Sequence, residues 1–117
     1  MANKKGTGMF MVWVDVPDDK LTEFHGYYNE EHLAELLAVP GVLNAARYEA
    51  VSSGPKQLAC YELESAAVIE TDAFKNRQPT ERSLRAGPRG VGTNLISNVY
   101  EMIYPAELTD DIAASDM

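Results

Sequence analysis

Apolar and polar positions along this chain form patterns that predict four strands and two helical regions. Strands are expected where β-branched and aromatic residues are concentrated and where proline or glycine ends the run. These runs are residues 9–16, 42–51, 56–64 and 93–104. The second and third runs flank a Ser-Ser-Gly-Pro turn, which predicts an antiparallel hairpin. Residues 65–76 and 79–85 predict a broken second helical region, and the glycine-rich residues 87–92 predict a loop.

The longest helix is expected to begin at Asp18 or Asp19 and to stop at Pro40-Gly41. An aspartate at its start can cap the helix and places negative charge at its positive end. One set of side chains recurs at spacings of one to four and therefore shares a face of a helix. The set is Leu21, Phe24, His25, Tyr28, His32 and Leu36. Because both histidines of the chain lie on the face that seeks the core, we expect this face to line a pocket.

The resulting order, β-α-β-β-α-β, predicts an α+β fold of the ferredoxin-like type, with one antiparallel sheet and helices on a single face. The first strand is apolar on both sides up to Asp15, so the other face of the sheet also needs a cover. We therefore expect two sheets to pack together in a homodimer. Residues 9–104 are expected to form this domain, between a loose N-terminal segment over 1–8 and an acidic tail over 105–117.

Composition and charge argue against several classes of function. A chain of 117 residues is long enough for one hydrophobic core and not for two. The net charge of −8 argues against binding to nucleic acid or to an anionic membrane surface, because both need a basic patch. No apolar run approaches the ~20 residues of a membrane span. The single Cys60 excludes an internal disulfide, and we expect a cytoplasmic protein.

Several short motifs resemble the EthD-like proteins of the dimeric α+β barrel superfamily. They are Tyr28-Asn29-Glu30-Glu31-His32-Leu33, Ala38-Val39-Pro40-Gly41-Val42, Arg47-Tyr48, Leu58-Ala59-Cys60-Tyr61-Glu62-Leu63-Glu64 and Pro79-Thr80. The resemblance covers residues 9–104. It implies a homodimeric barrel in which two sheets face each other and each subunit holds a pocket between its sheet and its helices. It also implies that His32 corresponds to the helix histidine of the family.

His32 is the leading candidate for chemistry. An imidazole titrates near neutral pH, so a modest change in its environment makes it an acid or a base. Tyr28, one turn before it, can donate a hydrogen bond to a substrate carbonyl or enolate. The structural alternatives are a His32 ring satisfied by Glu31, a strand residue or water, and a Tyr28 that packs in the core with its hydroxyl in water.

Three residues of the strands are candidates for substrate binding. Tyr61 lies on the central hairpin, and Asn98 and Tyr100 share one side of the last strand. If that side faces the helices, these residues form the floor of the pocket beneath His32. If it faces the partner subunit, they lie in the dimer interface, and the alternation of side chains leaves both arrangements open.

Basic side chains form the last group of candidates. His25, two turns before His32, is expected at the rim of the pocket or at the surface. Arg47 either receives an anionic group of the substrate or makes an ion pair with Glu49 or Glu62. Three further arginines are expected on a solvated surface that offsets the acidity of the chain: Arg82, Arg85 and Arg89.

We predict neither a metal nor another cofactor. His25 and His32 are seven residues apart rather than four, and we expect the side chains of Glu31 and Glu35 to point away from His32. The chain has no Gly-x-Gly-x-x-Gly, no phosphate loop and no Gly-x-Ser-x-Gly.

These observations favour a cofactor-independent enzyme that acts on a small, largely apolar carbonyl compound, aromatic or polyketide-like. His32 is expected to move a proton near the carbonyl while Tyr28 stabilises the oxyanion, in a cyclisation, dehydration, isomerisation or retro-aldol cleavage. The resemblance also implies cofactor-free oxygenases among the relatives. The alternatives are a non-catalytic carrier or accessory protein for a hydrophobic metabolite, and a structural dimer whose own side chains fill the pocket.

Overall fold

The computed structural model of this protein describes residues 6–104. Its elements follow the predicted β-α-β-β-α-β order, with the second helical region divided into short pieces. The strands are β1 (Gly8–Asp15), β2 (Val42–Glu49), β3 (Gln57–Leu63) and β4 (Thr93–Glu101). The helical pieces are η1 (Asp18–Lys20), α1 (Leu21–Tyr27), η2 (Tyr28–His32), α2 (Leu33–Leu37), η3 (Ala66–Glu70), α3 (Asp72–Lys75), α4 (Glu81–Ala86) and α5 (Pro88–Val91).

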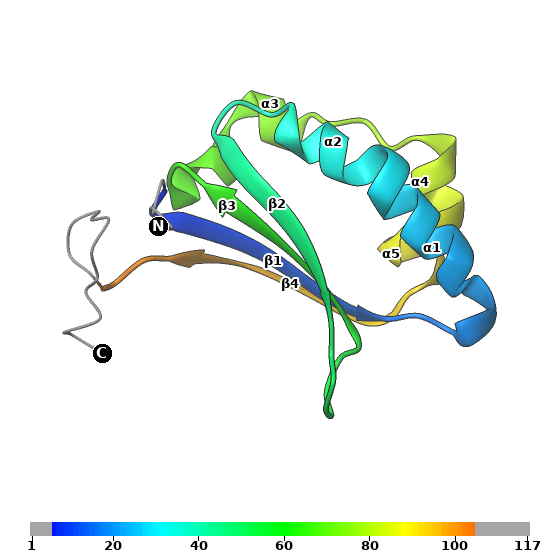
Figure 1. Ribbon diagram of the computed structural model, residues 1–117. Helices are drawn as coiled ribbons and strands as arrows, with labels where there is room; N and C mark the ends of the chain where they lie inside the picture. Colours follow the sequence, from blue (N-terminus) through cyan, green and yellow to red (C-terminus); the bar gives the residue numbers. More distant parts are fainter. Residues whose placement is uncertain (1–5, 105–117) are drawn as a thin grey trace.

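The four strands form one antiparallel sheet in the order β2-β3-β1-β4. Figure 1 shows that the helices lie on one side of this sheet and that the other side carries no described element. This is the ferredoxin-like α+β arrangement, so the predicted fold class is confirmed. Within residues 6–104, no helix has the length and apolar character needed to cross a membrane.

The predicted long helix runs from Asp18 to Leu37 through η1, α1, η2 and α2. Within it, η2 is a π turn, in which the Leu33 N–H bonds to the Tyr28 carbonyl five residues back instead of four. A π turn contains one residue more than an α turn, so it changes which side chains meet across it. Tyr27 and His32, five residues apart, consequently come to lie on the same side of the helix.

The core lies between this helix and the centre of the sheet. Its most deeply buried side chains are less than 2% exposed and come from helix and strands alike: Phe24, Tyr28, Leu36, Val14, Tyr61 and Leu63. Phe24, Tyr28 and Leu36 belong to the predicted apolar stripe, which is therefore confirmed as the face that meets the sheet. Aromatic rings join the two layers, since the ring of Phe10 on β1 meets that of Phe74 on α3 edge to face, with centroids 5.5 Å apart.

The face of the sheet turned away from the helices is apolar and lacks a cover within the described part of the chain. Side chains alternate along a strand, so Trp13 points away from the helices when Phe10 points toward them. The strand register places Trp13 beside Leu58 and Ile96, and Leu58 beside Tyr48, in one row across all four strands. Ile96 is 54% exposed and Tyr48 is 57% exposed. We call this row the open-face row.

Three segments differ from the prediction. Residues 87–92, expected to be a loop, contain the short helix α5 with Pro88 in its first turn. Residues 6–8, expected to be loose, are bonded to the sheet: the Thr7 N–H donates to the Glu64 carbonyl at 3.1 Å, and the Met102 N–H donates to the Thr7 carbonyl at 2.7 Å. The rest of the predicted loose segment and the predicted acidic tail lie outside the described residues.

Gly41 and Gly54 provide a matched test of the turn that follows the long helix. Both have positive φ angles, +94° and +102°, which favour glycine. A Cβ atom on Gly41 would lie 2.6 Å from Val68 Cγ2, whereas one on Gly54 would meet no atom within 4 Å.

We predict that Gly54→Ala lowers the free energy of unfolding by ~1–2 kcal/mol through backbone strain alone. Gly41→Ala should lower it by clearly more, because Val68 must also move. Urea unfolding followed by circular dichroism measures both losses. Equal losses would contradict the importance of the Val68 contact.

Candidate active site

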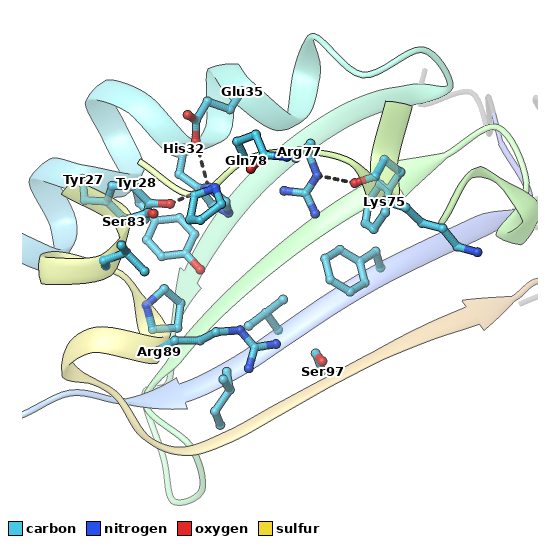
Figure 2. A pocket seen from close by; sticks show the side chains of 17 residues that line it. Tyr27, Tyr28, His32, Glu35, Lys75, Arg77, Gln78, Ser83, Arg89 and Ser97 are labelled. Carbon is cyan, nitrogen blue, oxygen red and sulfur yellow. Dashed lines mark hydrogen bonds and ion pairs between the residues drawn. The ribbon is translucent and has the colours of Figure 1, made fainter. Parts of the chain in front are cut away.

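A cavity of about 510 Å³ lies between the long helix, the segment from α3 to α5, and the β1–β4 side of the sheet. Figure 2 shows side chains from all three regions directed into it. Its apolar lining consists of Phe10, Val12, Phe74, Pro79, Leu84, Pro88 and Leu95. Its polar and charged lining consists of Tyr27, Tyr28, His32, Glu35, Lys75, Arg77, Gln78, Ser83, Arg89 and Ser97. A cavity that combines apolar walls with polar groups that point inward is typical of sites for small molecules.

The π turn is held in place by contacts to α4. Thr80 Oγ1 donates to Glu31 Oε2 at 2.7 Å, and Arg82 Nη2 donates to Glu30 Oε1 at 2.9 Å. Thr80 is also the N-cap of α4, so one residue positions both helices. These outward contacts leave the other side of the π turn to face the cavity.

His32 lies on the cavity wall within a small hydrogen-bonded group. Its Nδ1 is 2.8 Å from Tyr27 Oη and 3.3 Å from Glu35 Oε1. Nδ1 accepts from the Tyr27 hydroxyl in one tautomer of the neutral ring, and in the other it donates to Glu35 or to the Tyr27 oxygen. In one tautomer Nε2 carries the proton, and in the other its lone pair is free. The expectation that Glu35 points away from His32 is therefore wrong, because residues three apart on a helix are neighbours.

His32 is a neutral imidazole at physiological pH. Burial, aided by the positive charge of Arg77 and opposed by Glu31, lowers its pKa to about 4. Its ring packs against tyrosines on several sides, with centroids 5.1 Å from that of Tyr27 and 4.9 Å from that of Tyr28. Because the ring is already neutral, it can accept a proton or donate a hydrogen bond without first releasing a proton.

Tyr27 and Tyr28 bring two hydroxyl groups to the cavity. Burial, with Glu35 and Glu31 nearby, raises the pKa of Tyr27 to about 12. Burial also raises the pKa of Tyr28 far above its ordinary value. Both hydroxyls stay protonated at neutral pH and can donate hydrogen bonds to a ligand. Tyr28 thus lies beside His32 in the cavity, where the helical pattern placed it.

Tyr61 lies behind the cavity wall rather than on it. Its side chain is fully buried, and its ring centroid is 6.3 Å from that of His32. Its hydroxyl oxygen has no hydrogen-bond partner of ordinary geometry among the described residues, although Tyr28 is close enough to influence it. Tyr61 supports the ring stack and makes no wall of the cavity, contrary to the expected contact with substrate.

His25 and Arg47 lie outside the cavity and bond to each other. Arg47 Nη2 donates to His25 Nδ1 at 2.9 Å, and Nη1 donates to Asn29 Oδ1 at 2.9 Å. The guanidinium group also stacks over the ring of Tyr28, 5.0 Å from its centroid. Neither expected acidic partner makes an ion pair with Arg47. Neither residue lines the cavity, so the contacts that the structure gives them favour the structural alternative over a contact with a ligand there.

Asn98 and Tyr100 lie on the opposite face of the sheet. The register pairs Asn98 with Met11 and Tyr100 with Met9, whereas the cavity residue Ser97 pairs with Val12. The prediction that Asn98 and Tyr100 form the pocket floor is therefore wrong, and the alternative that places them on the uncovered sheet face agrees with the structure.

Several lining residues were not identified from the sequence: Tyr27, Glu35, Arg77, Ser83 and Arg89. The π turn turns Tyr27 toward His32, and a regular helical pattern contains no signal for that. Arg77 lies in the segment between two predicted helices, where periodicity places no side chain. Within residues 6–104, no three His, Cys, Asp or Glu side chains lie close enough to hold a metal ion.

Comparison with known proteins finds the same fold at low sequence identity. No protein-family model and no curated protein sequence matches the chain. An EthD family protein from Bacillus halodurans superposes with a TM-score of 0.58 and 16% identity, over 83% of this chain and 99% of that one. The heme degrader MhuD from Mycobacterium tuberculosis, with two hemes in its active site, superposes with a TM-score of 0.60 and 17% identity, over 86% and 99% of the two chains.

A mutant of SnoaB, a cofactor-independent oxygenase from Streptomyces nogalater, also matches. Its TM-score is 0.58 at 11% identity, over 82% of this chain and 92% of that one. At such identities the likeness establishes the fold. The chain therefore shares the α+β fold of these proteins, and its resemblance to EthD-like proteins is confirmed at the level of the fold.

Proposed function

We propose that this protein is an enzyme that needs no cofactor and moves a proton on a small, apolar, aromatic or polyketide-like carbonyl compound. The observation that carries the proposal is the position of His32, a neutral imidazole beside Tyr27 and Glu35 on the wall of a largely apolar cavity. The likeness to SnoaB, described as a cofactor-independent oxygenase, supports the view that this fold can carry chemistry without a cofactor.

The proposed step uses the tautomer in which His32 Nδ1–H donates to Glu35, because this leaves the Nε2 lone pair for the substrate. Nε2 takes a proton from the carbon next to the carbonyl, and the electrons of the C–H bond move to the carbonyl oxygen. Tyr28 donates a hydrogen bond to the enolate that results. The Glu35 carboxylate stabilises the imidazolium of His32. The imidazolium then returns the proton to the carbon or to a leaving group.

A general assay follows from this step: exchange of the protons next to a carbonyl in D₂O, observed by NMR with 2-tetralone as the substrate. Wild-type protein should accelerate exchange above the buffer rate. His32→Ala should lower the protein-catalysed rate by about 100-fold or more, the usual loss when a general base is removed. Tyr28→Phe should cause a smaller loss, because it removes one hydrogen bond to the oxyanion.

His25→Gln is the matched control for this assay. It changes the other histidine of the chain, lies outside the cavity, and keeps an acceptor for the Arg47 N–H. Its exchange rate should equal that of the wild type. Exchange that persists in His32→Ala would refute the proposed role of His32, and a wild-type protein that binds ketones without exchanging them would identify a carrier instead.

Stability should depend on pH through His32. Its pKa is about 4 in the folded chain and 6.5 in the ordinary reference state, so between these values the unfolded chain binds more protons. The contribution of His32 to the free energy of unfolding is therefore present above about pH 6.5 and falls as the pH drops towards 4. Urea unfolding at several pH values gives the free energy of unfolding of the wild type and of His32→Gln. The difference between the two free energies should shrink as the pH falls from 6.5 to 4. A constant difference would contradict the buried neutral state.

We also propose a homodimer that forms when two sheets cover each other at the open-face row. Burial of large apolar side chains such as Trp13 and Ile96 supplies the free energy of association. The uncovered sheet face is the feature that supports this proposal.

Ile96→Lys should convert the dimer to a monomer, because it places a charge within the proposed contact. Val51→Lys is the control, since Val51 is fully exposed beyond the end of β2 and lies outside the row. Sedimentation velocity distinguishes the two states. A wild-type monomer, or an Ile96→Lys dimer as stable as the wild type, would overturn the proposal.

A further inference from the structure

Two arginines line the cavity without an acidic partner among residues 6–104: Arg77 and Arg89. The chain has 18 acidic residues against 10 lysines and arginines, so carboxylates are plentiful. Three neighbouring cations do have acidic partners. Lys75 lies 3.0 Å from Glu70, Arg82 lies 2.9 Å from Glu30, and Arg85 lies 3.5 Å from Glu23. Among the described cations from α3 to α5, the two without an ion pair are thus the arginines that line the cavity, whereas Arg82 and Arg85 lie outside it.

Arg77 is held in a position suited to an anion. Its Nε donates to the Phe74 carbonyl at 2.9 Å, and its guanidinium carbon lies 4.4 Å from the centroid of the Phe74 ring. These contacts use Nε and one face of the group, and they leave both terminal amino groups without a partner. A guanidinium group with two parallel N–H donors matches the two oxygens of a carboxylate.

Arg89 supplies a second cation from a different element. It belongs to α5, and Figure 2 shows its side chain and that of Arg77 both directed into the cavity. The sequence analysis assigned Arg89 to a solvated surface together with Arg82 and Arg85. Arg89 is solvent-exposed, as expected, and it also lines the cavity, whereas Arg82 and Arg85 do not.

We infer that the substrate carries a carboxylate, which Arg77 binds while Arg89 adds a second positive charge to the cavity. This inference rests on the proposed function and refines its substrate class to aromatic or polyketide-like keto acids. The apolar walls, including Phe10 and Leu95, accommodate the body of such a molecule. Its carbonyl would lie at His32 and its carboxylate at Arg77.

A carboxylate at Arg77 also connects binding with the chemistry at His32. After burial, the charge of Arg77 is the next cause of the low pKa of His32. A bound carboxylate offsets that charge, so the imidazole becomes a stronger base when the substrate is present. The other ionisable groups beside His32 are Glu31, Glu35, Tyr27, Tyr28 and Tyr61.

Such a pair of ligands is 2-naphthoate and its neutral analogue 2-naphthamide. We expect the wild-type protein to bind the carboxylate at least about tenfold more tightly, because charge-assisted hydrogen bonds are the stronger kind. Chemical shifts of the protein report both affinities. They also report the pKa of His32, which should be higher in the 2-naphthoate complex than in the 2-naphthamide complex.

Variants of the arginines show which side chain causes the preference for the carboxylate. Arg77→Gln should remove most of the preference for the carboxylate and leave only the part that the charge of Arg89 supplies. Arg77→Lys should lose less of it, because lysine keeps the charge without the paired donors. Arg85→Gln makes the same change of charge at a surface ion pair with Glu23 and should leave the preference intact. The amide spectrum of each variant verifies that it folds.

Equal affinity for the two ligands, no saturable binding of 2-naphthoate, or a preference as large in Arg77→Gln as in the wild type would each overturn this inference. Proton exchange is measured separately, so the two proposals can fail independently. A protein that prefers the carboxylate through Arg77 but exchanges no ketone protons would keep the anion site and lose the enzymatic function.

Discussion

The π turn at Tyr28–His32 is the constraint on which the arrangement of the site depends. One extra residue in the long helix lets Tyr28 remain in the core while Tyr27 and His32 meet at 2.8 Å. An uninterrupted α-helix would place Tyr27 on another side, and His32 would lose its shortest hydrogen bond. The turn is supported from outside by Thr80 and Arg82, so the connection that carries α4 also determines where the imidazole lies.

Burial and charge act together in this cavity. Apolar walls and packed tyrosine rings keep His32 neutral and the tyrosines protonated, which is the state suited to accepting one proton and stabilising one developing negative charge. The cations at the cavity act on a ligand instead, since Arg77 and Arg89 would attract an anion into a site whose remaining walls combine apolar and polar groups. The formal charge of the whole chain, −8, gives no indication of this local reversal of sign.

Much of the fold was predictable because it depends on short-range patterns. Prolines and glycines such as Pro17 and Gly41 mark where strands and the long helix end, and the stripe of Phe24, Tyr28 and Leu36 identifies the face that meets the sheet. The site was predicted only in part. His32 and Tyr28 were found because they lie on that stripe, whereas Asn98 was misplaced because period-two alternation leaves both faces of a strand equivalent.

By itself, the sequence determined the order of the elements, the antiparallel ferredoxin-like sheet and the helix face that carries His32, because each follows from the spacing of apolar side chains along the chain. Only the tertiary structure decided which sheet face lines the cavity, that Arg47 lies outside it, and that Arg77 and Arg89 reach the cavity without acidic partners. These facts depend on contacts between segments far apart in sequence. Local periodicity contains no information about such contacts, since it describes each segment apart from its neighbours in space.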